Sequence, residues 1–150
     1  GGGQEKDFRS GTENVAGIMG LKVATEFMYE NLEKRKKHLE HLRDLLIAGI
    51  SKIEDHKFLT NKDGVPNIVT VAFENIRSEV LLHFLESEKI YISTGSACTA
   101  GVVQVSHVLQ AFYGEESPRL HESVRVSISP QNTEKEMITL AKTLKEIIGG

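Results

Sequence analysis

The chain has 150 residues, of which 39% are hydrophobic and 26% are charged, a composition typical of one soluble globular domain with a real core. Its formal net charge of -3 gives no reason to expect nucleic acid or an anionic membrane as a partner, and no apolar run reaches the roughly 18 residues that a membrane span needs. One cysteine cannot form an internal disulfide, which favours a reducing, cytoplasmic location.

The N-terminal part of the chain predicts a loop followed by helices. Residues 1–11 are rich in glycine and polar side chains and predict the loop. Thr12 is the expected N-cap of the first helix, with Glu13 in its first turn. From Leu32 onward, leucine and isoleucine recur at spacings of three and four, the pattern of a helix with one buried face. The residues of that face are Leu39, Leu42, Leu46, Ile50 and Ile53.

Strands and helices alternate through the rest of the chain. A turn cluster at residues 61–66 precedes Asn67 to Phe73, which is β-branched and roughly alternating and predicts a strand. Strands are predicted at residues 67–73, 89–92 and 123–128, and helices at residues 78–88, 105–113 and from residue 132 to the end.

This alternation predicts an α/β fold in which one small sheet has helices layered on one face. Residues 1–30 precede that layer and are expected to form an approach segment, and residues 31–150 are expected to form the domain itself.

The only cysteine, Cys98, lies in a run of nine residues, Ser93 to Gly101, with no bulky and no charged side chain. Inert burial is the commoner fate of a lone cysteine, but a thiol kept for packing normally has apolar neighbours. These small polar neighbours favour a solvated loop in which the thiol can meet a reaction partner. No Lys, Arg or His lies close in the sequence, so activation has to come from the fold, a substrate or a cofactor.

Two other segments carry candidate binding residues. Arg125 interrupts an otherwise apolar-alternating strand, and it either faces outward or points into a cleft to bind a carboxylate. Residues 9–12 (Arg-Ser-Gly-Thr) precede a helix, which makes them either an ordinary capped helix start or a phosphate site.

The histidines add little to this set. His38 and His41 are three residues apart on the charged helix, where surface positions are expected rather than a shared metal. His107 and His121 flank the cysteine segment and the Arg125 strand, and either could donate a proton.

Together and in this order, these segments resemble the C-terminal part of the NifS/IscS-class cysteine desulfurases, which are pyridoxal-phosphate (PLP) enzymes of the aminotransferase class V group. The resemblance runs essentially from end to end. It rests on Gly1-Gly2-Gly3-Gln4-Glu5, Arg9-Ser10-Gly11-Thr12, Pro66-Asn67-Ile68, Ser93-Thr94-Gly95-Ser96-Ala97-Cys98 and Val124-Arg125-Val126-Ser127.

The resemblance implies the small C-terminal domain of the type I PLP-dependent aminotransferase fold, preceded by a long helix from the large domain. Residues 1–30 would then be the tail of the large domain, and residues 31–150 the small domain. Cys98 would take sulfur from L-cysteine and become a persulfide, and Arg125 would bind the substrate's α-carboxylate. Thr12 would reach the PLP phosphate of the partner subunit in a homodimer. The implied acceptor is an iron–sulfur scaffold or a similar protein.

The resemblance also implies that this chain is one part of such an enzyme. The family's Schiff-base lysine stands in a Ser-x-His-Lys setting, which the chain lacks. The histidine that stacks on the cofactor ring and the acid that pairs with its pyridine nitrogen also have no counterpart. We therefore expect the isolated chain to be inactive. Two other interpretations stay open: a persulfide carrier that needs no cofactor, and a structural or interaction domain with an unused thiol.

Overall fold

The structure is a computed structural model that describes residues 2–8, 10–61, 63–94 and 105–149. The chain divides into two compact units, Gly1–Arg35 and Lys36–Gly150, each with its own internal contacts. None of the helices in the described part combines the length and the apolar character that a membrane span requires.

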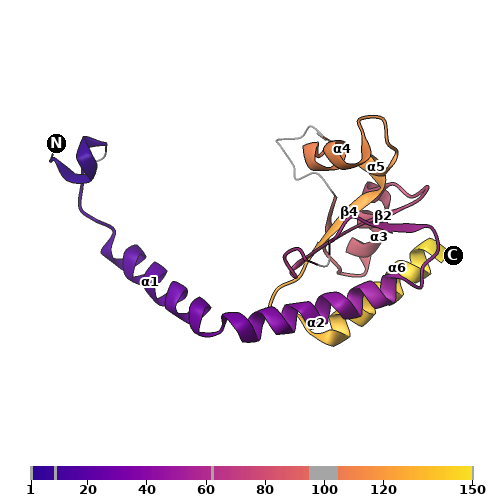
Figure 1. The fold of residues 1–150 in the computed structure, drawn as a ribbon, viewed down its shortest axis with the longest axis horizontal. Coiled ribbons are helices and arrows are strands. Elements are labelled where there is room, and N and C mark those ends of the chain that lie inside the picture. The colour runs from indigo at the N-terminus through magenta and orange to yellow at the C-terminus, as the bar shows by residue number, and fades with distance from the viewer. Residues whose placement is uncertain (1, 9, 62, 95–104, 150) are drawn as a thin grey trace. The chain divides into compact units, whose positions relative to one another are not determined.

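The first unit contains a short 3-10 helix, η1 (Gln4–Asp7), and the helix α1 (Val15–Glu30) (Figure 1). Asn14 caps α1, because its Oδ1 atom accepts a hydrogen bond from the Gly17 backbone N–H at 3.1 Å. The predicted cap at Thr12 is therefore wrong. Both residues precede the same apolar run, but Asn14 is adjacent to the first helical residue, and asparagine caps at least as well as threonine.

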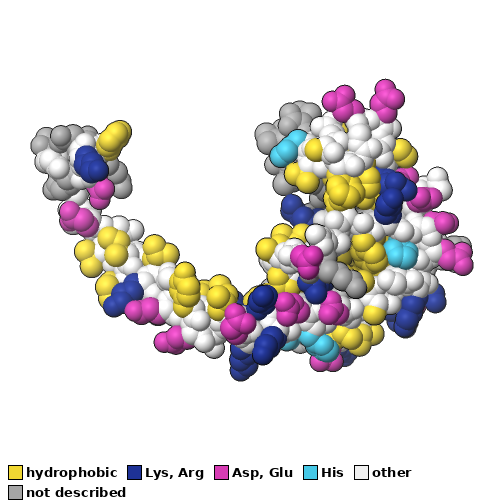
Figure 2. All heavy atoms as spheres, viewed as in Figure 1, with side chains coloured by type: hydrophobic (Ala, Val, Ile, Leu, Met, Phe, Trp, Pro, Cys, Tyr) yellow, Lys and Arg dark blue, Asp and Glu magenta, His cyan; other side chains and the backbone are white. Residues whose placement is uncertain are grey.

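None of the side chains of α1 is buried, and Figure 2 shows apolar side chains along the visible face of this helix. An exposed apolar surface of this size on one helix normally meets another protein surface. The large apolar residues exposed on α1 are Val15, Ile18, Met19, Leu21, Val23, Phe27, Met28 and Tyr29.

The second unit is built on an antiparallel sheet of four strands in the order β1-β2-β4-β3. The central strands β2 and β4 pair over five positions, with Val71 opposite Val124. The strands are β1 (His56–Phe58), β2 (Ile68–Phe73), β3 (Ser93–Thr94) and β4 (Ser123–Ser127).

Helices cover one face of this sheet and form the core with it. Figure 1 shows α2 (Leu32–Ile50) and α6 (Glu134–Gly149) running side by side along the sheet. Their apolar faces and that of α3 (Ser78–Ser87) pack against alternate residues of β2 and β4. The core side chains include Leu42, Leu46, Ile50, Val69, Val71, Phe73, Leu81, Leu85, Val124, Val126, Leu140 and Leu144.

Two short helices, α4 (His107–Tyr113) and α5 (Arg119–Glu122), precede β4 in the chain. Ser106 is the N-cap of α4, since its hydroxyl oxygen accepts from the Leu109 N–H at 3.4 Å. The predicted helix at residues 105–113 is thus confirmed, whereas α5 was not predicted.

The predicted α/β fold, with a small sheet and helices layered on one face, is confirmed, and β2 and β4 are the predicted strands at residues 67–73 and 123–128. The strand predicted at residues 89–92 is wrong, because the ladder contains only Ser93 and Thr94. Ile90 and Ile92 pack against the core without pairing in the sheet. The alternation of apolar residues indicates that they are buried, and residues can be buried in this pattern in a strand or in an irregular segment.

Candidate functional site

Cys98, the predicted nucleophile, lies outside the described residues, as does Arg9. The described part of the chain closest to Cys98 is β3, whose last residue, Thr94, precedes the cysteine by four positions. The sequence therefore joins the cysteine segment directly to the edge strand of the sheet.

Arg125 lies in the middle of β4, on the face of the sheet that is opposite the core. Val124 and Val126 are buried in the core, and Arg125 between them is half-buried, as expected from the alternation of side chains along a strand. The register places Arg125 opposite both Thr70 of β2 and Ser93 of β3. Three polar side chains thus form a row across three strands, which we call the Arg125 row.

The Arg125 guanidinium has an unsatisfied group. Its Nε atom is buried and, within the described part of the chain, has no hydrogen-bond partner. A buried N–H without an acceptor costs free energy, more so on a charged group. A solvent-facing arginine would leave this atom in water. Of the two interpretations of Arg125, the buried Nε favours a guanidinium that awaits an anionic ligand.

Thr12 belongs to the first unit and Arg125 to the second. Thr12 is exposed and lines a cavity of about 270 Å³ beside the start of α1, together with Ser10. Hydroxyl groups at the start of a 16-residue helix fit a phosphate. The carboxylates of Glu5 and Glu13 also line this cavity, so the positive charge that a phosphate needs has to come from other residues.

His38 and His41 connect α2 to the start of α6. The Nε2 atom of His38 lies 3.2 Å from the carbonyl oxygen of Asn132, and that of His41 lies 3.0 Å from Glu134 Oε1. The described residues contain no group of three His, Cys, Asp or Glu side chains that could hold a metal. His107 and His121 are both exposed. The contacts of His38 and His41 indicate a structural role in which they link α2 to the start of α6.

Tyr113 is a feature that the sequence did not single out. Its hydroxyl is buried without a partner in the described structure, and the Arg119 guanidinium lies 5.6 Å from the centre of its ring. Burial raises the pKa of the Tyr113 hydroxyl above its ordinary value, and the charge of Arg119 offsets part of this rise. The sequence could not have revealed this site, because nothing in the helix pattern distinguishes Tyr113 from a packing residue.

The comparisons with known proteins agree on one family. The model of the family Aminotransferase class-V matches residues 2–140. Cysteine desulfurase IscS of Methanosarcina thermophila is 40% identical over 153 residues, which cover 99% of this chain and 37% of that protein. Cysteine desulfurase NifS of Azotobacter vinelandii is 38% identical over 152 residues, with coverage of 99% and 37%. The chain thus spans little more than a third of the length of these curated relatives.

The solved structures give the same result for the fold. A NifS-like protein superposes with a TM-score of 0.81 at 35% identity, covering 99% of this chain and 38% of that chain. A NifS-like protein from Rickettsia africae superposes with a TM-score of 0.83 at 27% identity, covering 100% and 39%. The predicted fold, the C-terminal part of a PLP-dependent aminotransferase, is confirmed, and the chain belongs to the aminotransferase class-V family.

Proposed function

We propose that this chain is the C-terminal segment of a cysteine desulfurase, which converts L-cysteine to alanine and holds the sulfur as a persulfide on Cys98. The observation that carries the proposal is the buried Nε of Arg125, which has no partner among the described residues and belongs to a polar row. A guanidinium in this state suits the α-carboxylate of an amino acid. The match over 99% of this chain to proteins named cysteine desulfurase supports the same substrate.

We further propose that residues 1–30 are the tail of a large PLP-binding domain and residues 31–150 are the small domain. The support is the exposed apolar surface of α1, which an additional domain would cover. The relatives are long enough to contain such a domain, since this chain covers 37% of their length.

PLP supplies an electron sink when it is bound. In this proposal most of its contacts come from residues outside this chain, and Thr12 contributes a hydroxyl to the phosphate held by the partner subunit of a homodimer. The hydroxyls of Thr12 and Ser10 at the start of α1 fit that role, while the nearby Glu5 and Glu13 require that the cationic phosphate ligands lie elsewhere.

Arg125 binds and orients the substrate through a charge-assisted pair with the α-carboxylate. The half-buried position of Arg125 strengthens that pair relative to one in water. Thr70 and Ser93, its cross-strand neighbours, keep the surroundings of the guanidinium polar. Binding the carboxylate at a fixed point of the sheet fixes where the rest of the amino acid can lie.

Cys98 then acts as the nucleophile towards the substrate's sulfur. A new S–S bond forms on Cys98 while the bond between Cβ and sulfur in the substrate breaks, and Cβ takes up a proton to give alanine. Cys98 follows Thr94 by four positions, a span of at most roughly 14 Å. Cys98 would afterwards pass the persulfide to an acceptor protein for iron–sulfur cluster or thio-cofactor assembly.

The test compares this chain alone with the same chain extended at its N-terminus to the full length of its relatives. Both are incubated with L-cysteine and PLP, and alanine is measured. We expect alanine from the extended protein and none from the isolated chain. An extended protein that binds PLP and forms no alanine would overturn the proposal. If the extended protein forms no alanine and the isolated chain acquires a persulfide from a sulfane-sulfur donor, the result would favour the persulfide carrier that needs no cofactor.

A further inference from the structure

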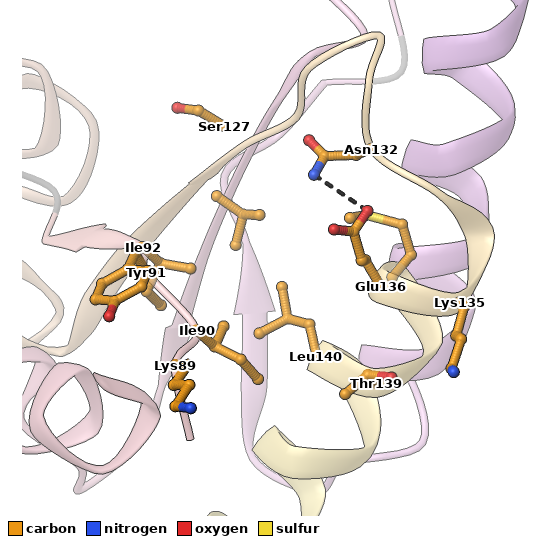
Figure 3. Close-up of a pocket in the computed structure, with 12 residues that line it drawn as sticks. Lys89, Ile90, Tyr91, Ile92, Ser127, Asn132, Lys135, Glu136, Thr139 and Leu140 are labelled. Carbon is orange, nitrogen blue, oxygen red and sulfur yellow. Dashed lines mark hydrogen bonds between the residues drawn. The ribbon is translucent and has the colours of Figure 1, made fainter. Parts of the chain in front are cut away.

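A second candidate binding site lies at the edge of the sheet, and none of the residues of the Arg125 row lines it. It is a cavity of about 520 Å³ between the segment preceding β3, the end of β4 and the first turns of α6. Its floor is apolar, and Figure 3 shows Ile90 and Leu140 between Lys89 and Lys135. A cavity of this size is within the range of ligand-binding pockets.

The cavity exists because two neighbouring segments diverge. The ladder between β3 and β4 pairs Ser93 with Arg125 and Thr94 with Val124 and then stops. Continuing the same register would place Ile92 opposite Val126 and Tyr91 opposite Ser127, but neither pair forms. Ile90 and Ile92 remain packed on the core, so the space opens between them and β4.

This divergence leaves backbone groups of β4 facing the cavity. The Ile128 N–H donates to the carbonyl oxygen of Asn67, at 2.7 Å, on the β2 side. Because backbone groups alternate sides along a strand, those of Ser127 point to the opposite side, where the ladder with β3 has ended. An unpaired strand edge of this kind accepts an extended peptide as an additional strand.

Positive charges outnumber negative ones among the residues that line the cavity. Lys89 and Lys135 line it, and neither forms an ion pair with any described residue. Glu136 is the only carboxylate among the lining residues, and it is engaged at the start of α6. Its Oε2 atom accepts from the Thr133 N–H at 2.6 Å and from the Thr133 hydroxyl at 3.0 Å. The lining residues thus carry two positive charges and one negative charge, which leaves a net positive charge at the cavity.

We propose that this cavity binds an extended acidic segment of a partner protein. The peptide backbone pairs with the free edge at Ser127, one apolar side chain enters the cavity above Leu140, and flanking carboxylates meet Lys89 and Lys135. The site requires neither PLP nor Cys98, so it is independent of the proposed enzymatic function. It is tested by binding alone.

The experiment titrates the 150-residue chain with a capped, fluorescein-labelled hexapeptide that alternates leucine and glutamate. The control peptide alternates leucine and lysine. We expect saturable binding of the acidic peptide only, with amide NMR shifts centred on Tyr91 and Ser127. The double variant Lys89→Glu, Lys135→Glu should weaken acidic-peptide binding by about tenfold or more. Thr139→Trp, which fills the cavity from its exposed rim, should abolish it.

Lys145→Glu is the matched control, because Lys145 is on the same helix but lines a different hollow. It should leave the affinity unchanged, and circular dichroism should show that all variants fold. The proposal is overturned if both peptides bind equally or if neither binds. It is also overturned if Lys145→Glu weakens binding as much as the double variant does. Octanoate that competes as tightly as the peptide would assign the cavity to a small amphipathic acid instead.

Discussion

Ser93 of β3 lies directly opposite Arg125 of β4, and the Ser93 hydroxyl donates to the Arg125 carbonyl oxygen at 3.3 Å. The strand that carries the guanidinium is thus bonded to the strand that leads into the Cys98 segment. In the proposed enzyme, the group that holds the substrate's carboxylate and the strand that leads to the nucleophile are therefore neighbours in one sheet.

Replacing Arg125 should weaken substrate binding without lowering the stability of the fold. Arg125→Met removes a buried N–H that has no acceptor in the described part of the chain, so the free energy of unfolding of the isolated chain should stay the same or rise by about 1 kcal/mol. In the full-length enzyme the same change should raise KM for L-cysteine by about two orders of magnitude.

The measurements are chemical denaturation of the chain and steady-state kinetics of the full-length enzyme. Arg77→Met is the control, since the Arg77 side chain is 69% exposed beside Glu79, and it should change neither quantity. An unchanged KM in Arg125→Met would contradict the carboxylate role.

Thr12 and Asn14 should have separable roles at the start of α1. Asn14→Ala removes the observed cap and should lower the helix content of α1, at a cost of about 1 kcal/mol. Thr12→Val should leave helix content unchanged and weaken PLP retention in the full-length protein. Far-UV circular dichroism and PLP absorbance measure the two effects. Loss of helix in Thr12→Val would assign Thr12 to helix capping instead.

Gly49 should be required for the packing of α2 against α6. A Cβ atom at this position would overlap the Cβ of Ala141, so Gly49→Ala should lower the free energy of unfolding by about 1–3 kcal/mol. Gly20→Ala is the control, because no atom lies near its added Cβ, and it should stabilise slightly. Ala141→Gly should recover part of the loss, and a double-mutant cycle would measure the coupling. Equal effects of Gly49→Ala and Gly20→Ala would argue against this close approach.

The cap of α6 should make stability depend on acid pH. Hydrogen bonds from the Thr133 backbone, the Thr133 hydroxyl and Asn132 lower the pKa of Glu136 in the folded chain. The folded state therefore holds fewer protons there than the unfolded state, and this contribution is lost as pH falls through the lowered pKa. Glu136→Gln should be less stable than the parent at about pH 7 and equal to it at about pH 2. A difference that persists unchanged in acid would exclude the carboxylate as its source.

Predictions from the sequence were most accurate where the residues that are buried also lie in a hydrogen-bonded strand. Val69, Val71 and Phe73 alternate in β2 and face the core, so period-2 alternation located the strand correctly. Arg125 lies between the buried Val124 and Val126 and faces away from the core for the same reason. Its partners Thr70 and Ser93 come from the register of three strands, which no local pattern encodes.

The errors have equally local causes. β1 has three residues, His56 to Phe58, which are too few to show a period. Ile90 and Ile92 alternate as a strand would, but they fill a gap beside the core. The cap at Asn14 and the candidate at Thr12 are only two residues apart, and a pattern of polar residues before a helix does not distinguish them.

The central claim is that Cys98 receives the sulfur of L-cysteine, and mass spectrometry of the full-length protein tests it most directly. After brief exposure to L-cysteine, the peptide containing Cys98 should gain about 32 Da, the mass of one sulfur atom, with one alanine released per persulfide. The Cys98→Ser variant should bind PLP normally and form no alanine. Alanine formation by Cys98→Ser at the rate of the parent would contradict the claim. So would the accumulation of alanine without any persulfide on Cys98, measured under conditions that preserve persulfides.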